Sequence, residues 1–122
     1  MSSARASTRI ILLGTESADV LTGVTTGASQ PIQMSQYLTP TIYLIGAGTI
    51  SAGTLLIETA ESQNYSGTWS SIYSADCTNV TGGAVKMICL TGTNSFAWLR
   101  VRLSVDVSGS GGKVAVVLRA AQ

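Results

Sequence analysis

The chain has 122 residues, of which 45% are hydrophobic and only 11% are charged, and its formal net charge is +1. This length suffices for one domain with a real core, and so little charge in so apolar a chain excludes intrinsic disorder. The small net charge excludes the strongly positive surface that typically binds nucleic acid or an anionic membrane. The composition also suggests that much of the surface is covered by other copies or by a larger assembly.

Residues 1–8 are rich in Ser and Ala and predict a flexible N-terminal arm, which could become ordered on a partner. The apolar run that follows, 10–13, is too short for the core of a signal peptide. Residues 9–122 contain no linker and no clear internal repeat. They are therefore expected to form a single domain.

Short apolar runs separated by Gly, Ser and Thr predict strands rather than helices. In chain order, the predicted strands are 9–13, 20–25, 30–35, 41–47, 54–59, 68–74, 85–90, 96–107 and 113–120. Eight or nine short strands at this spacing are typical of a sandwich or barrel. We therefore expect an all-β protein with an antiparallel, jelly-roll-like β-sandwich.

The segment between Asp19 and Glu58 carries no charge. Part of it, 38–57, is apolar over about the length that a membrane-spanning helix needs. However, Pro40 and several glycines interrupt it, and no Lys or Arg flanks it closely, which favours two strands around a turn. The uncharged stretch 20–57 is expected to face the core on one side and a neighbouring subunit on the other.

The clearest pattern is W-L-R-V-R-L-S-V-D-V at 98–107. Leu99, Val101, Leu103, Val105 and Val107 alternate with Trp98, Arg100, Arg102, Ser104 and Asp106, which predicts a strand with one apolar and one charged face. A flexible G-S-G-G turn at 109–112 leads to a second apolar strand. This order predicts a long β-hairpin whose apolar side is covered by a second sheet.

The residues offer little reactive chemistry. Histidine is absent, which removes the commonest general base and the usual Ser-His and Cys-His pairs. Glu58 and Glu61 are interpreted as solvated loop carboxylates. Cys77 and Cys89 have no metal-site spacing and would form either one disulfide or two buried free thiols. We expect no enzyme activity, no catalytic or metal-ligating residue and no cofactor.

Arginines are the best candidates for contacts with a partner protein. Arg100 and Arg102 project from one strand of the predicted hairpin, and Arg119 lies on the other. The three guanidinium groups could therefore bind carboxylates of a partner protein. The alternative is a solvated face with Asp106 as local counter-charge. In the N-terminal region, a tether would use Arg5 and Arg9. The candidate partner-binding residues are Arg5, Arg9, Arg100, Arg102 and Arg119.

Aromatic residues allow a second function. Trp69, Tyr73, Tyr65 and Trp98 could form a platform on which a sugar stacks, with Trp69 and Tyr73 at i and i+4 on one face of a strand. The alternative is that these rings fill the core or a subunit interface.

Two segments of the chain together resemble a known family. The first is G-T-L-L-I-E at 53–58 followed by S-G-T-W-S-S-I at 66–72, and the second is F-A-W-L-R-V-R-L at 96–103 with the Gly-rich turn and the valine-rich strand after it. The order, over about a third of the chain, resembles small β-sandwich structural proteins of tailed bacteriophages that decorate or cement the capsid.

The resemblance implies a virion structural protein on the capsid surface, assembled in the cytoplasm of the bacterial host. Such a protein would bind the major capsid protein and its own copies, as a homotrimer, and would stabilise the shell. Neither nucleic acid nor a membrane is an expected partner. The alternative is a carbohydrate-binding module or a β-sandwich module of a tail or fibre.

Overall fold

The computed structural model describes residues 7–35, 37–90 and 97–121, and this part of the chain is almost entirely β-structure. Its elements, in chain order, are β1 (Ser7–Leu13), β2 (Thr15–Ser17), β3 (Val20–Thr22), β4 (Ile32–Gln33), β5 (Leu38–Ala47), β6 (Ala52–Ala60), β7 (Ser70–Asp76), the 3₁₀ helix η1 (Cys77–Gly83), β8 (Val85–Cys89), β9 (Trp98–Ser108) and β10 (Lys113–Ala121). The predicted all-β class is confirmed.

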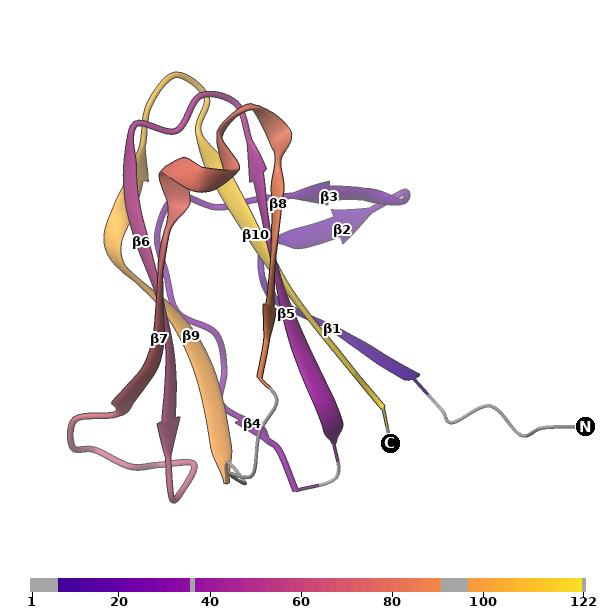
Figure 1. Cartoon of the computed structure of the whole chain (residues 1–122), viewed down its shortest axis with the longest axis vertical. Helices are drawn as coiled ribbons and strands as arrows, with labels where there is room; N and C mark the ends of the chain where they lie inside the picture. Colours follow the sequence, from indigo (N-terminus) through magenta and orange to yellow (C-terminus); the bar gives the residue numbers. More distant parts are fainter. Residues whose placement is uncertain (1–6, 36, 91–96, 122) are drawn as a thin grey trace, which may run out of the picture.

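Two four-stranded sheets form the two layers of the molecule (Figure 1). The first sheet has the order β1-β10-β5-β8 and the second has the order β4-β9-β6-β7, and neighbouring strands in both are antiparallel. The short hairpin β2–β3 lies outside both sheets and projects from the body of the molecule. The fold is a β-sandwich, as the strand spacing predicted.

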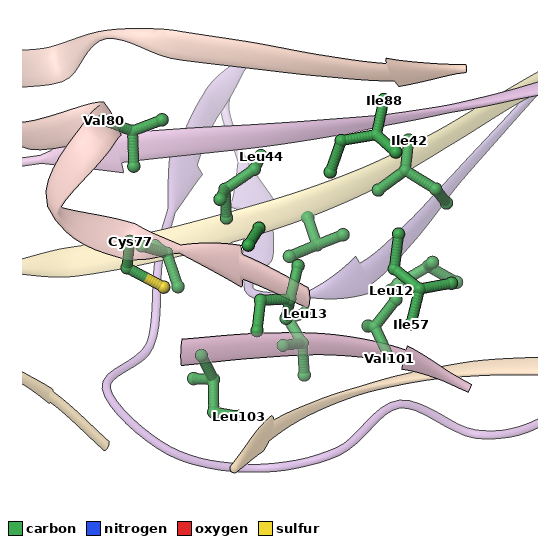
Figure 2. Close-up of a cluster of buried hydrophobic side chains, with 14 of the residues drawn as sticks. Leu12, Leu13, Ile42, Leu44, Ile57, Cys77, Val80, Ile88, Val101 and Leu103 are labelled. Carbon is green, nitrogen blue, oxygen red and sulfur yellow. The ribbon is translucent and has the colours of Figure 1, made fainter. Parts of the chain in front are cut away.

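The core fills the space between the two sheets and is built from alternate residues of the long strands (Figure 2). Its largest fully buried side chains are Ile42, Leu44, Leu55, Ile57, Val80, Leu99, Val101, Val114, Val116 and Leu118, together with Cys77. Burying one aliphatic side chain of this size contributes about 1.5–3 kcal/mol. Helix η1 closes one part of the core with Cys77 and Val80, and the carboxylate of Asp76 caps it by accepting from the backbone N–H of Thr78.

The predicted hairpin between 98–107 and 113–120 is wrong. Strand β9 lies between β4 and β6 in the second sheet, whereas β10 lies between β1 and β5 in the first. The turn at 109–112 therefore carries the chain from one sheet to the other. Both strands have an apolar face, and placing them in opposite sheets lets those two faces meet across the core.

The predicted strands all overlap strands of the structure, but several details differ. Strand β2 was not expected, and β1 begins at Ser7, two residues before the predicted boundary. Residues 1–6 of the predicted arm, and Phe96, lie outside the described residues. The apolar face of β9 is interrupted at Val105, which is 50% exposed because register shifts against β6 pair it with the outward-facing Thr54.

Residues 38–57 form most of β5 and β6 on either side of a turn, which confirms the prediction of two strands there. Within the described part of the chain, no helix has the length and hydrophobicity that crossing a bilayer requires.

Candidate protein-interaction surfaces

The outer face of the first sheet carries apolar side chains on its solvent side. The antiparallel register aligns Val117, Tyr43 and Met87 in one row across β10, β5 and β8, and aligns Ile45 with Val85 in the next row. Strand β8 is the edge of the sheet, and its Val85 and Met87 side chains are 56% and 58% exposed. We call these five residues, Tyr43, Ile45, Val85, Met87 and Val117, the outer apolar face.

A groove of about 470 Å³ crosses this face and is open to solvent. Its lining consists of Arg9, Tyr43, Ile45, Val85, Val117 and Arg119, and we call it the outer groove. The two arginines are register partners on β1 and β10, so they stand beside each other on the β1 side of the groove. Its floor is apolar, because Ile45, Val85 and the buried Val117 line it.

The charges of the two groove arginines are balanced differently. Arg9 donates from Nη1 and Nη2 to the two carboxylate oxygens of Glu16, both at 3.0 Å. Arg119 forms no ion pair with any residue that the structure describes. The outer groove therefore combines an apolar floor with one cationic group that has no internal counter-charge.

The outer face of the second sheet holds a different cluster, centred on Glu58. This carboxylate is only 4% exposed. Arg100 donates from Nε to its Oε1 at 2.9 Å, and Arg102 donates from Nε and Nη2 to Oε1 and Oε2 at 3.2 and 3.1 Å. The interpretation of Glu58 as a solvated loop carboxylate is wrong, because it lies in β6 directly opposite Arg100 of β9.

The two arginines determine the ionisation of Glu58. Burial by itself raises the pKa of this carboxyl group, but the hydrogen bonds from Arg102 and Arg100, together with their positive charges, outweigh burial and leave the pKa below its ordinary value. In return, the hydrogen bond to Glu58 raises the pKa of Arg102. At neutral pH the cluster therefore holds two guanidinium cations and one carboxylate, with a net charge of +1.

Trp69 belongs to the same cluster. The Arg100 guanidinium lies 4.4 Å from the centre of the Trp69 ring, and the indole Nε1 donates to the Tyr65 carbonyl oxygen at 3.2 Å. The ring is 5% exposed and precedes β7, which begins at Ser70. The structure therefore contradicts the possibility of a sugar platform with Trp69 and Tyr73 on one strand. Trp69 is a packed residue, as the alternative interpretation held.

The three arginines predicted to lie together, Arg100, Arg102 and Arg119, lie on different sheets in the structure. Arg100 and Arg102 lie on the second sheet and bind Glu58, while Arg119 lies on the first sheet beside Arg9. The predicted cluster of three is wrong because β9 and β10 belong to opposite sheets. The expected counter-charge was Asp106, whereas the one observed is Glu58. Arg5 lies outside the described residues.

Sequence reasoning missed the outer groove, since its lining comes from four strands distant in sequence. One signal for the Glu58 cluster was available. In 54–59, Glu58 follows the inward-facing Ile57, and an outward carboxylate beside an R-x-R strand is the natural partner for two arginines on the same face.

The two cysteines are free, which excludes the disulfide alternative in this structure. Cys77 is buried in the core, and burial and the neighbouring Asp76 charge raise the pKa of its thiol to about 11. Cys89 is exposed on β8, so the expectation of two buried thiols is wrong for this residue. Among the described residues, no group of three or more His, Cys, Asp or Glu side chains could hold a metal ion.

Comparisons with known proteins extend this description of a β-sandwich with an apolar outer face. No protein-family model matches the chain, and no curated protein matches it in sequence. Among solved structures, the chain is similar to the crystal structure of YomS, an SPBc2 prophage-derived protein. The TM-score is 0.55 at 10% sequence identity, over 100% of this chain and 98% of that chain. This likeness shows a shared fold along the entire chain.

Proposed function

We propose that the chain is a virion structural protein of a tailed bacteriophage, of the capsid decoration or cement type. It binds the outer capsid surface through contacts with the major capsid protein and with its own copies, as a homotrimer, and so stabilises the shell. The observation that carries this proposal is the outer apolar face. Contiguous exposed apolar surface of this kind is typical of protein–protein contacts. The fold shared with a prophage-derived protein supports a phage context.

The energetics suit a cementing role. Each Å² of apolar surface that is buried contributes roughly 25 cal/mol, and many identical copies on one shell multiply a weak contact. A rigid two-sheet body presents the surface without a large ordering cost on binding. The guanidinium of Arg119 at the groove, which has no ion pair with a described residue, would orient the contact, since charges at an interface contribute more to specificity than to affinity.

The first test is mass spectrometry of purified particles from the phage or prophage that encodes this chain, with capsids and tails separated before digestion. We expect the protein in the capsid fraction at a stoichiometry that matches a repeated capsid site. Its recovery with tails alone would transfer the assignment to a tail or fibre module. Absence from both fractions would overturn a virion role.

The second test asks whether the outer apolar face is the surface in use. Val85→Glu places a carboxylate on this face, and Val105→Glu makes the same change on the outer face of the second sheet, at a valine of similar exposure, 56% against 50%. We expect Val85→Glu to lower incorporation into particles by at least about tenfold, which is 1.4 kcal/mol. Val105→Glu should leave it unchanged, and equal losses would contradict the proposal.

A carbohydrate-binding module is the less supported alternative. One face of the Trp69 ring is covered by Arg100, and its indole N–H is already bonded to a backbone carbonyl. The exposed rings of the candidate platform are Tyr65, in the loop before β7, and Tyr73, in β7, so a stacking platform would have to do without Trp69.

A further inference from the structure

The hairpin β2–β3 is a largely exposed part of the described structure. It projects away from the two sheets (Figure 1), and residues 15–20 are all exposed. Val20 is the most exposed large apolar side chain among the described residues, at 63%. A two-stranded ribbon alone in water is marginally stable. The hairpin therefore lacks a surface that covers its tip.

The tip carries a carboxylate where glycine would be expected. Ser17 pairs with Val20, which leaves a two-residue loop, and its Ala18 and Asp19 have positive φ values of 50° and 64°. Such a turn favours Asn-Gly or Gly-Gly, because an L side chain is strained there. Asp19 forms no ion pair with any described residue. The hairpin thus presents an unpaired carboxylate next to an exposed valine.

The outer groove presents the complementary features. Its floor of Ile45, Val85 and Val117 would accept an apolar side chain such as Val20, and Arg119 beside it has no carboxylate partner among the described residues. The second arginine of the groove is already neutralised by Glu16. One aliphatic side chain with one adjacent carboxylate would therefore satisfy the groove.

The hairpin of the same chain does not reach its own groove. The Arg9–Glu16 ion pair holds the base of the hairpin against β1. After the hairpin, Val24 exchanges two backbone hydrogen bonds with Val114 of β10, at 2.8 and 2.9 Å. With its base held in this way, the tip points away from the sandwich (Figure 1).

We propose that the tip of hairpin β2–β3 docks into the outer groove of a second copy of this chain, with Val20 on the apolar floor and Asp19 paired with Arg119. The two surfaces differ, so the contact runs head to tail, and its repetition can close into a ring. The homotrimer would be such a ring. This inference rests on the part of the proposed function in which the chain assembles with its own copies.

The test is a double-mutant cycle on the self-association of the full chain, measured by sedimentation and light scattering over a range of concentrations. Asp19→Asn removes the charge and keeps a side chain that tolerates positive φ. Arg119→Gln removes the other charge. Each change should weaken association by up to about fivefold, and the double variant should be no weaker than either single variant. Asp106→Asn, an exposed carboxylate on the second sheet, is the matched control and should have no effect.

Two results would overturn the contact. One is a wild-type chain that stays monomeric at all concentrations, and the other is a double variant whose loss is the product of the two single losses. Both results leave the capsid assignment standing if mass spectrometry finds the protein in capsids. If the double variant is no weaker than either single variant but the protein is absent from particles, the contact between copies stands and the capsid assignment is overturned.

Discussion

Glu58 is the residue whose environment differs most from what its sequence neighbourhood suggests. Its carboxylate is buried, yet both oxygens accept hydrogen bonds from arginines on the adjacent strand. An unpaired buried charge is strongly unfavourable, and two neighbouring guanidinium groups repel each other, so the three charges depend on one another. Trp69 adds a cation–π contact on Arg100 and connects the loop before β7 to the cluster.

Glu58→Gln should destabilise the protein by about 2 kcal/mol, because the amide is neutral and leaves Arg100 and Arg102 without their counter-charge. Urea unfolding followed by tryptophan fluorescence measures this loss. Glu61→Gln is the matched control, since Glu61 is exposed and forms no ion pair with a described residue, and it should change stability by less than about 0.5 kcal/mol.

The same carboxylate predicts a pH dependence. The pKa of Glu58 is lower in the folded chain than its ordinary value of 4.5, so the folded state binds this proton less readily than the unfolded state. The stabilisation is therefore fully present above about pH 4.5 and is lost as the pH falls through the folded-state pKa. We expect the stability difference between wild type and Glu58→Gln to shrink over that range. A difference that stays constant from neutral pH to acid would contradict this role.

At the scale of elements, the connection between β9 and β10 decides the architecture. The turn packs against the β5–β6 connection, where Thr49 N–H donates to the Ser110 carbonyl at 3.0 Å and Ser51 N–H donates to the Ser108 carbonyl at 2.8 Å. Gly109 has a φ of +130°, and a Cβ there would overlap the Thr49 carbonyl oxygen. The flexible turn predicted from G-S-G-G is thus a specific crossing between sheets.

Gly109→Ala should destabilise the protein by at least about 2 kcal/mol, because it adds a backbone clash to a conformation that L residues avoid. Gly111→Ala in the same turn is the matched control. Gly111 also has a positive φ, +70°, but a Cβ there would meet open space, so only about 1 kcal/mol of backbone strain is expected. Equal losses in urea unfolding would show that the contact with Thr49 has no effect.

At the scale of the whole molecule, the two outer faces differ in kind. The second sheet carries the Glu58 cluster and Trp69 on its outer side, where Arg100 and Arg102 are both hydrogen-bonded to one carboxylate. The first sheet leaves an apolar face, a groove and one unpaired guanidinium open to solvent. This asymmetry is the reason why the proposed partner contact is assigned to the first sheet rather than to the second.

The rate at which the Cys89 thiol reacts with a reagent tests whether the outer face of the first sheet becomes covered. Cys89 lies on β8 beside the outer apolar face, whereas Cys77 is buried with a pKa of about 11. We expect a thiol reagent at neutral pH to modify Cys89 rapidly and Cys77 only on unfolding. In the assembled state Cys89 should become protected, and Cys89→Ser should abolish the fast phase. A Cys89 that reacts equally fast in monomer and assembly would show that the first sheet stays uncovered.

The sequence by itself determined the all-β class, the places of the strands and most of the inward-facing residues. These follow from side-chain alternation and turn residues, which are local properties of a strand, so the inward-facing residues of 98–103 could be identified in isolation. Errors at this level include the unexpected strand β2 and Val105, where register shifts against a neighbouring strand change which face a residue occupies.

Only the tertiary structure decided which strands became neighbours. Sheet membership depends on pairings between distant segments, such as Glu58 with Arg100, 42 residues apart, and no local pattern encodes them. It separated Arg119 from Arg102, buried Glu58 and assembled the outer groove from β1, β5, β8 and β10. Hydrophobic alternation specifies that a face is buried but not which face covers it, because apolar attraction is non-directional.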